Sequence, residues 1–325
     1  MRRLSLLESI AGSYSAEILL ALCRSPLATE LLEPCTAVCL AHRHRLSLLG
    51  LTHLLEYLAR STDLLRKEGD HYQLRATPAS LAAIRYQLEK FRGAYGPAVS
   101  ACLDSLRDEK LGRDRVDREA LASAFVAMGD SVNGEALQAI QEAGIGFLLD
   151  LGCGPASLLR ELALRNHRFI GIGIDENAAM CRAARRRLRE LRVEKRVTII
   201  HGDATAGALS RISFGRKTRV EALHGGSFLN AFFARGEAGV IAVLKDLAGL
   251  FPGRSAWFVD YYGGRSSAVN MLQDVAQVVS GQGVPAATRT AWSRIYRAAG
   301  CLVVSLKDYR SGPTEWFLHH VVLRK

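Results

Sequence analysis

Apolar residues follow a helical period over the first part of the chain. Leucines recur at three- and four-residue spacing in "SAEILLALC" and "RLSLLGLTHLLEYLAR". Two short β-capable runs then flank the turn sequence Glu68-Gly69-Asp70, and helices followed by a hairpin predict a winged helix-turn-helix. A helical pattern returns from residue 78 to about 142. We therefore predict an all-helical, winged-helix N-terminal domain over residues 1–142.

The period changes at Gly146. The stretches "FLLDLG", "FIGIGID", "VTIIHGD", "VEALHG" and "AWFVDYY" are short apolar runs, and helical segments separate most of them. This alternation predicts a parallel sheet with helices on both faces. The last two runs, "CLVVSLKDY" and "EWFLHHVVLRK", have only a short loop between them, which requires antiparallel pairing. We expect an α/β, Rossmann-like, seven-stranded sheet with an antiparallel last strand over residues 143–325.

Composition narrows the class of protein. The chain has 325 residues, of which 49% are hydrophobic and 23% charged, as in globular proteins. We find no apolar run near the roughly 18 residues that span a membrane. The start is too short for a secretory signal, and the seven cysteines are scattered and odd in number. These features predict a cytoplasmic protein with reduced thiols and no membrane partner.

The net charge of +11 has two interpretations. It is compatible with a nucleic-acid partner, or with the arginine-rich surface of a protein from a GC-rich genome. The run "RAARRRLRELR" lies on a predicted helix with glutamates at hand, which is typical of a solvated face. We favour the surface interpretation and expect no nucleic-acid partner.

Three acidic residues mark the ends of the first three predicted strands. Asp150, Gly152 and Gly154 form D-x-G-x-G after the first strand, where glycines let a ligand approach the backbone. A dinucleotide fingerprint would need a glycine at Ser157, so a pyrophosphate cradle is disfavoured. Asp175 ends the second strand, where a carboxylate suits ribose hydroxyls, and Asp203 ends the third, where it suits an adenine amino group. Each alone is also a common helix cap.

This arrangement resembles the class I S-adenosylmethionine-dependent methyltransferases over roughly residues 145–325. The resemblance implies S-adenosylmethionine as cofactor. It assigns the methionine part to Asp150, Gly152 and Gly154, the ribose to Asp175, and the adenine to Asp203 with the adjacent Ala204.

The two-part layout is similar to small-molecule O-methyltransferases, whose N-terminal region dimerises and closes over the substrate. In that family an L-H-D-W element after the fourth strand supplies the general base; here the matching residues are Leu223, His224, Gly225 and Gly226. The resemblance implies a homodimer, a small-molecule substrate and His224 as base. Histidine titrates near neutral pH, which suits that role. The alternative is a histidine packed at a strand end. The two glycines suggest room for a bulky acceptor.

A closer resemblance concerns bacterial enzymes that methylate the β-carbon of α-keto acids. It rests on "EKFRGAYGP", "LFPG" and "SGQGVPAATRTAWSRIYRAAG". The phenylpyruvate enzyme of that group binds iron through a His-Asp pair and a later histidine. This chain has Gly225 in place of the aspartate and no histidine between His224 and His319, so we predict no metal. The acceptor atom is then a hydroxyl oxygen or an acidic carbon.

Further side chains are candidates for contact with the acceptor. Arginine pairs bidentately with carboxylates, and aromatic or acidic residues near the rim suit a pocket. The candidates are Asp260, Tyr262, Arg265, Trp292 and Tyr296, with Arg289 and Arg294 as further carboxylate clamps. Cys35, Cys39 and His42 share a helical face, but we favour core cysteines over a zinc site. Two alternatives stay open: an RNA or DNA methyltransferase, and a winged-helix regulator that senses the cofactor.

Overall fold

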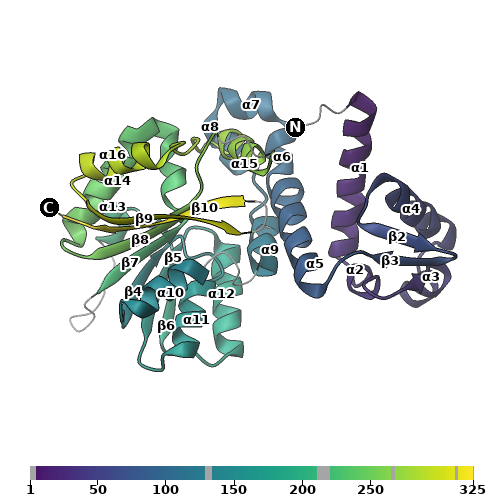
Figure 1. Cartoon of the computed structure of the whole chain (residues 1–325), viewed down its shortest axis with the longest axis horizontal. Coiled ribbons are helices and arrows are strands. Elements are labelled where there is room, and N and C mark those ends of the chain that lie inside the picture. Colours follow the sequence, from purple (N-terminus) through teal and green to yellow (C-terminus); the bar gives the residue numbers. More distant parts are fainter. Residues whose placement is uncertain (1–4, 129–133, 211–219, 265–267, 312–313, 325) are drawn as a thin grey trace. The chain divides into compact units, whose positions relative to one another are not determined.

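The computed structural model describes residues 5–128, 134–210, 220–264, 268–311 and 314–324 (Figure 1). The chain forms two compact units, Met1–Ala94 and Tyr95–Lys325. The predicted domain boundary at residues 142 and 143 marks the start of the sheet, and the preceding helices from residue 95 onward group with the sheet. The division of roles between the two predicted domains stays a prediction.

The first unit combines helices with a small antiparallel sheet. The helices are α1 (Leu6–Cys23), α2 (Leu27–Glu30), α3 (Ala37–His44), α4 (Leu48–Ser61), α5 (Pro78–Gln87) and the π-helix η1 (Leu88–Ala94). The strands β1 (Cys35–Thr36), β2 (Leu65–Glu68) and β3 (His71–Leu74) lie in the order β1-β3-β2. The expected helices and hairpin are present, with Gly69 at φ +60° in the turn, where glycine is favoured. Fully buried Leu40, Leu55 and Leu58 pack in the core.

Helix α1 is the one helix in the described ranges that is long and apolar enough to cross a membrane by length and composition alone. A capping box of Ser5 and Glu8 starts it. Leu19, Leu20 and Leu22 are buried at its C-terminal end, whereas Leu6 and Leu7 at its start are exposed.

The second unit contains the predicted seven-stranded sheet. Its strands are β4 (Phe147–Leu151), β5 (Ile170–Asp175), β6 (Val197–His201), β7 (Ala222–Gly226), β8 (Ser255–Asp260), β9 (Leu302–Ser311) and β10 (Thr314–Val322). They lie in the order β6-β5-β4-β7-β8-β10-β9. Strands β4 to β8 pair in parallel, and β10 is antiparallel to both of its neighbours. The predicted fold class is confirmed.

Helices cover both faces of this sheet (Figure 1). One face packs against α10 (Gly134–Glu142), α11 (Ser157–Arg165) and α12 (Ala178–Glu190). The other packs against the 3-10 helix η2 (Leu229–Arg235), α14 (Gly236–Leu250) and α16 (Arg289–Ala298). The remaining helices are α6 (Gly96–Ser100), α7 (Cys102–Arg107), α8 (Glu109–Asp114), α9 (Arg118–Met128), α13 (Ala206–Leu209) and α15 (Ala268–Val279). The carboxyl ends of the five parallel strands therefore share one rim.

Candidate functional site

The turn after β4 has the backbone shape that its glycines predict. Gly152 and Gly154 have φ values of +66° and +55°, in the region that favours glycine. The amides of Gly152 and Cys153 donate to Ile174 O at 2.8 and 3.0 Å, which holds the turn against β5. An added Cβ at Gly154 would have nothing within 4 Å. The turn is therefore fixed on its strand side and open at Gly154, as a site for close ligand approach requires.

Asp175 lies beside this turn, at the end of β5. Its carboxylate accepts from Gly154 N and from Asn177 N, both at 2.8 Å. Burial raises the pKa of Asp175, and these two amide donors oppose the rise. Each oxygen keeps a lone pair, because a carboxylate has about four acceptor sites. Asp175 is thus suited to accept from ribose hydroxyls while it fixes the turn.

Asp203 follows β6 and is exposed. Its two oxygens accept from the amide and the hydroxyl of Thr205, both at 2.8 Å, as a cap of the following turn. The adjacent Ala204 is buried in the core. The assignment of both residues to an adenine stays a prediction.

His224 and Asp150 form a buried pair at the centre of the sheet. They are register partners in the neighbouring parallel strands β7 and β4. Nδ1–H of His224 donates to Oδ1 of Asp150 at 2.7 Å, and each residue is only 2% exposed. Nε2 of His224 is buried and has no hydrogen-bond partner. The sequence predicted separate roles for the two residues, whereas the structure joins them.

Gly225 and Gly226 face opposite sides of the sheet. An added Cβ at Gly226 would lie 3.3 Å from Cε1 and 3.9 Å from Nε2 of His224. An added Cβ at Gly225 would instead lie 3.1 Å from Phe228 and 3.2 Å from Phe258. The suggestion that both glycines leave room for an acceptor is therefore wrong for Gly225, whose surroundings are already packed. Gly226 lies against the imidazole edge, where an added Cβ would crowd Cε1 of His224.

Three of the predicted acceptor-binding residues meet around His319, which the sequence did not single out as a site residue. The Tyr262 hydroxyl lies 3.3 Å from Nε2 of His319, and the Tyr296 hydroxyl lies 3.1 Å from Nδ1. The Trp292 ring packs edge-on against the His319 ring, and Phe317 stacks on it. Strand alternation in "FLHH" was the available signal, since it turns Phe317 and His319 to one face.

This aromatic group is fully buried. Burial lowers the pKa of His319 to about 3, so its imidazole is neutral at ordinary pH. Burial also raises the pKa of Tyr262 and of Tyr296. The group behaves as a polar core of the unit, and contact of Tyr262, Trp292 and Tyr296 with an acceptor stays a prediction.

The charged candidates are dispersed. Buried Asp260 accepts from Asn230 N at 3.2 Å and from Tyr261 N at 3.0 Å, and so ties η2 to the end of β8. Arg289 pairs with Asp308 at 2.8 Å, and Arg294 pairs with Glu237 at 2.6 Å. Arg265 lies outside the described residues. The two described arginines have carboxylate partners within the chain.

No group of three or more histidine, cysteine, aspartate or glutamate side chains is placed to hold a metal ion in the described ranges. On α3 and β1, Cys39 and His42 are exposed and Cys35 is half-buried. His44 instead pairs with Glu30 at 2.8 Å.

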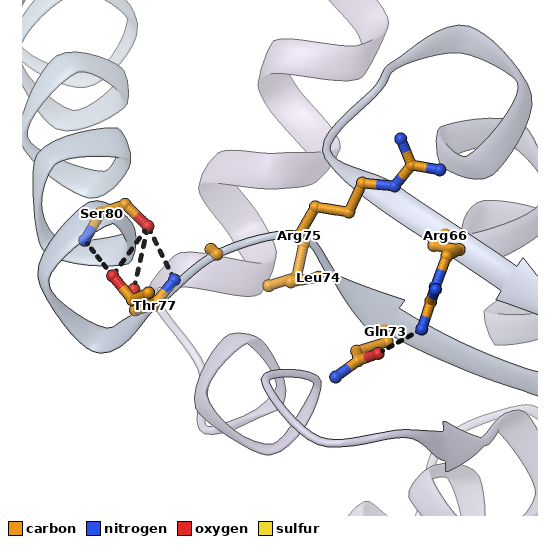
Figure 2. A pocket seen from close by; sticks show the side chains of 7 residues that line it. Arg66, Gln73, Leu74, Arg75, Thr77 and Ser80 are labelled. Atoms are coloured by element: carbon orange, nitrogen blue, oxygen red, sulfur yellow. Dashed lines mark hydrogen bonds between the residues drawn. The ribbon is translucent and has the colours of Figure 1, made fainter.

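Two surface hollows of the first unit lie around its hairpin. Figure 2 shows the one of about 480 Å³, where Arg66 donates to Gln73 at 3.0 Å and Thr77 bonds Ser80 at the start of α5. Arg75 also lines this hollow. Its lining has no carboxylate or histidine, so it offers no acid-base chemistry.

Comparisons with known proteins agree with this geometry. Residues 148–225 match the family model of a methyltransferase domain. The uncharacterized protein YjhP of Escherichia coli (strain K12) is 34% identical over 110 residues. That stretch is 34% of this chain and 42% of YjhP, so the match spans less than half of that relative.

Solved structures match over nearly the whole chain. The mitomycin 7-O-methyltransferase MmcR has a TM-score of 0.73 at 16% identity, over 98% of this chain and 96% of its own. Human N-acetylserotonin methyltransferase, solved with SAM, has a TM-score of 0.70 at 16% identity, over 98% and 97%. Residues 148–225 therefore match a methyltransferase domain, and the chain shares the class I fold of these solved methyltransferases.

Proposed function

We propose that the protein transfers a methyl group from S-adenosylmethionine to a small molecule, with His224 as the general base. The methyl acceptor is a hydroxyl oxygen or the acidic carbon of an α-keto acid. The observation that supports this most is the buried pair of His224 and Asp150 beside the glycine turn. The known O-methyltransferases of the same fold support a small molecule as substrate.

The residues around the turn suit the cofactor. The open space at Gly154 admits a ligand against the backbone, and the free lone pairs of Asp175 suit ribose hydroxyls. S-adenosylmethionine would supply a methyl group bonded to a positively charged sulfur, and when that carbon–sulfur bond breaks the sulfur keeps the electron pair and leaves as neutral S-adenosylhomocysteine. The bond to His224 uses Oδ1 of Asp150 alone, so Oδ2 can make the predicted contact with the methionine part.

The pair is arranged to move a proton. Because Nδ1–H donates to Asp150, the neutral ring has its lone pair on Nε2, the atom that has no other partner. Nε2 accepts the acceptor's proton as the acceptor atom forms its bond to the methyl carbon. The carboxylate of Asp150 then stabilises the imidazolium, as an aspartate does in hydrolase triads. Such proton transfer contributes about 10²- to 10⁴-fold to rate.

We further propose that the first unit mediates dimerisation and closes over the substrate, on the basis of the resemblance to O-methyltransferases. Exposed leucines at the start of α1 support an apolar contact there. The proposed cellular location is the cytoplasm.

Calorimetry and kinetics test the proposal together. S-adenosylhomocysteine should bind the intact protein, and Asp175→Ala should weaken this binding. His224→Ala should reduce methyl transfer by about 10²-fold or more while the affinity for S-adenosylhomocysteine is retained. Exposed His167, on the loop before β5, offers the control variant His167→Ala. Absence of binding to the intact protein would refute the cofactor assignment; unchanged turnover in His224→Ala would refute the base.

A further inference from the structure

Two cysteines lie close together where helix α3 of the first unit begins. Cys35 belongs to β1, Thr36 is the N-cap of α3, and Cys39 lies in the first turn of that helix. The sequence favoured core packing for both cysteines, yet Cys35 is half-buried and Cys39 is exposed. The structure describes all seven cysteines of the chain, and Cys39 is the one that is exposed. Core packing therefore does not account for this pair.

The start of α3 brings the two thiols into contact. The amide of Cys39 donates to Oγ1 of Thr36 at 3.1 Å, so the first turn of the helix folds back onto the residue next to Cys35. A side chain just before an N-cap commonly packs on that first turn. Burial raises the pKa of Cys35, and so does a hydrogen bond between its thiol and that of Cys39. Cys35 is held from the other side by β3, where Tyr72 is its register partner.

The surroundings of the two sulfurs differ. Nη2 of Arg43 donates to Sγ of Cys39 at 3.6 Å, and Nη1 of the same side chain donates to Glu30 at 2.6 Å, which fixes the guanidinium. Exposure and a neighbouring cation are the features of cysteines that attack other sulfur atoms. Sγ of Cys35 is half-buried and lies 3.8 Å from the carbonyl oxygen of Thr36. Cys39 is therefore arranged to react first and Cys35 second.

We propose that Cys35 and Cys39 form a reversible thiol–disulfide site that is oxidised by a low-molecular-weight disulfide. The Cys39 thiolate attacks one sulfur of the oxidant, whose sulfur–sulfur bond breaks, and the first thiolate leaves with the electron pair. The Cys35 sulfur then loses its proton to water and attacks Sγ of Cys39, and the second thiolate leaves. The two cysteines are oxidised to one disulfide, and the oxidant is reduced to two thiols.

The site adds a property that the proposed methyl transfer does not require. All of its residues belong to the first unit, whereas the proposed cofactor and base residues belong to the second. Intracellular disulfides are mostly transient and serve catalysis or redox sensing, so a reversible pair suits the proposed cytoplasmic location. Failure of this inference would leave the proposed function untouched, and the reverse also holds.

Mass spectrometry of the native, full-length protein tests the site. The protein is incubated with oxidised glutathione, its remaining thiols are alkylated, and it is digested with trypsin. Residues 25–43 form one tryptic peptide that contains Cys35 and Cys39 and no other cysteine. We expect this peptide to lose two hydrogen atoms, and dithiothreitol to restore them. Half-buried Cys102 on α7 is the matched control, and the peptide should react about tenfold faster than Cys102 or more.

Three outcomes would overturn the inference. They are a stable mixed disulfide with glutathione on the wild-type peptide, a peptide that reacts no faster than Cys102, and equal reaction of buried Cys23. Cys23 lies in the core of the same unit, so its reaction would mean that oxidation follows unfolding.

Serine variants separate the roles of the two thiols. Cys35→Ser should stop at a mixed disulfide on Cys39, because the second attacking sulfur is missing. Cys39→Ser should slow modification of the peptide by about tenfold or more, because the remaining thiol is half-buried. Cys102→Ser is the control and should form the disulfide as the wild type does. Faster modification of Cys39→Ser than of Cys35→Ser would reverse the assigned order of attack and so contradict it. The wild-type result decides the proposal even where a variant fails to fold.

Discussion

At the scale of single residues, Asp150 has two roles to account for: it binds His224, and it is predicted to contact the methionine part of the cofactor. Asp150 was predictable as the acid before the glycine turn, and His224 as the histidine at the end of the fourth apolar run. Their 2.7 Å contact was not predictable from spacing, because 74 residues separate them and only the adjacency of β4 and β7 brings them together. If His224 is the base, the neighbouring strand supplies the carboxylate that the L-H-D-W element of small-molecule O-methyltransferases places directly after the histidine.

The variant Asp150→Asn tests whether Asp150 acts mainly on His224 or on the cofactor. If Asp150 orients His224 and stabilises its charged form, turnover should fall by about 10- to 100-fold while the affinity for S-adenosylhomocysteine changes little. Steady-state kinetics and calorimetry on the same preparation measure both. A large loss of cofactor affinity with turnover preserved at saturation would instead support the methionine contact.

His319 gives a prediction about acid stability. Burial lowers its pKa to about 3 in the folded protein, against the ordinary histidine value of 6.5, so protonation favours the unfolded chain. The stability contributed by the neutral ring is complete above pH 6.5 and is lost as the pH falls from 6.5 toward 3. At pH 5 this loss is about 2 kcal/mol.

The comparison of His319→Gln with the wild type isolates this contribution. The difference in free energy of unfolding between them should shrink by about 2 kcal/mol from pH 7 to pH 5, as measured by urea denaturation. The exposed-residue variant His167→Gln should follow the wild type. A constant difference between His319→Gln and wild type across this range would contradict the assignment.

At the scale of elements, glycines in β5 set how closely the turn approaches the sheet. An added Cβ at Gly173 would lie 2.7 Å from Sγ of Cys153 and 3.0 Å from Leu159. An added Cβ at Gly171 would lie 2.9 Å from Leu159. The strand "IGIGID" was predictable as a strand from its apolar alternation. The reason for its glycines was not, because it depends on a helix and a turn that pack across it.

Gly173→Ala should therefore destabilise the fold by about 1–3 kcal/mol and weaken S-adenosylhomocysteine binding, because Cys153 belongs to the proposed cofactor turn. Gly202→Ala is the matched control, since an added Cβ there would have nothing within 4 Å. Urea denaturation and calorimetry on both variants check the prediction. Equal stability of the two variants would show that the turn relaxes freely.

At the scale of the whole molecule, the sequence predicted the order of helices and strands better than it predicted where individual side chains lie. Strand and helix rhythm predicted the seven-stranded sheet, because local periodicity reflects burial on one or two faces. The aromatic candidates were placed at a binding pocket, yet Trp292 and Tyr296 pack in the core around His319. The orientation of α15 was also unpredictable, since the periodicity of "AVNMLQDVAQVV" shows an amphipathic helix without showing that Gln273 and Gln277 face inward and Leu272 outward.

At this scale we predict that two copies of the chain associate as a homodimer. Leu6 and Leu7 of α1 are 76% and 77% exposed, which is unusual for adjacent large apolar residues. If this surface forms the proposed dimer contact, analytical ultracentrifugation should find a dimer, and Leu7→Lys should shift it toward monomer. Leu164→Lys, at an exposed leucine of α11, should leave the dimer intact. A monomeric wild type at micromolar concentration would refute the dimer.

The central position of the His224 and Asp150 pair also determines the order in which parts of the proposed site are lost during local unfolding. Central strands exchange their amide hydrogens only through large openings, while exposed turns exchange through small local ones. The proposed base lies in the centre of the sheet, whereas Asp203, the proposed adenine contact, lies on an exposed turn at its rim. Mild heating should therefore release the proposed cofactor contact first, and a protein that no longer binds the cofactor would still hold His224 and Asp150 together.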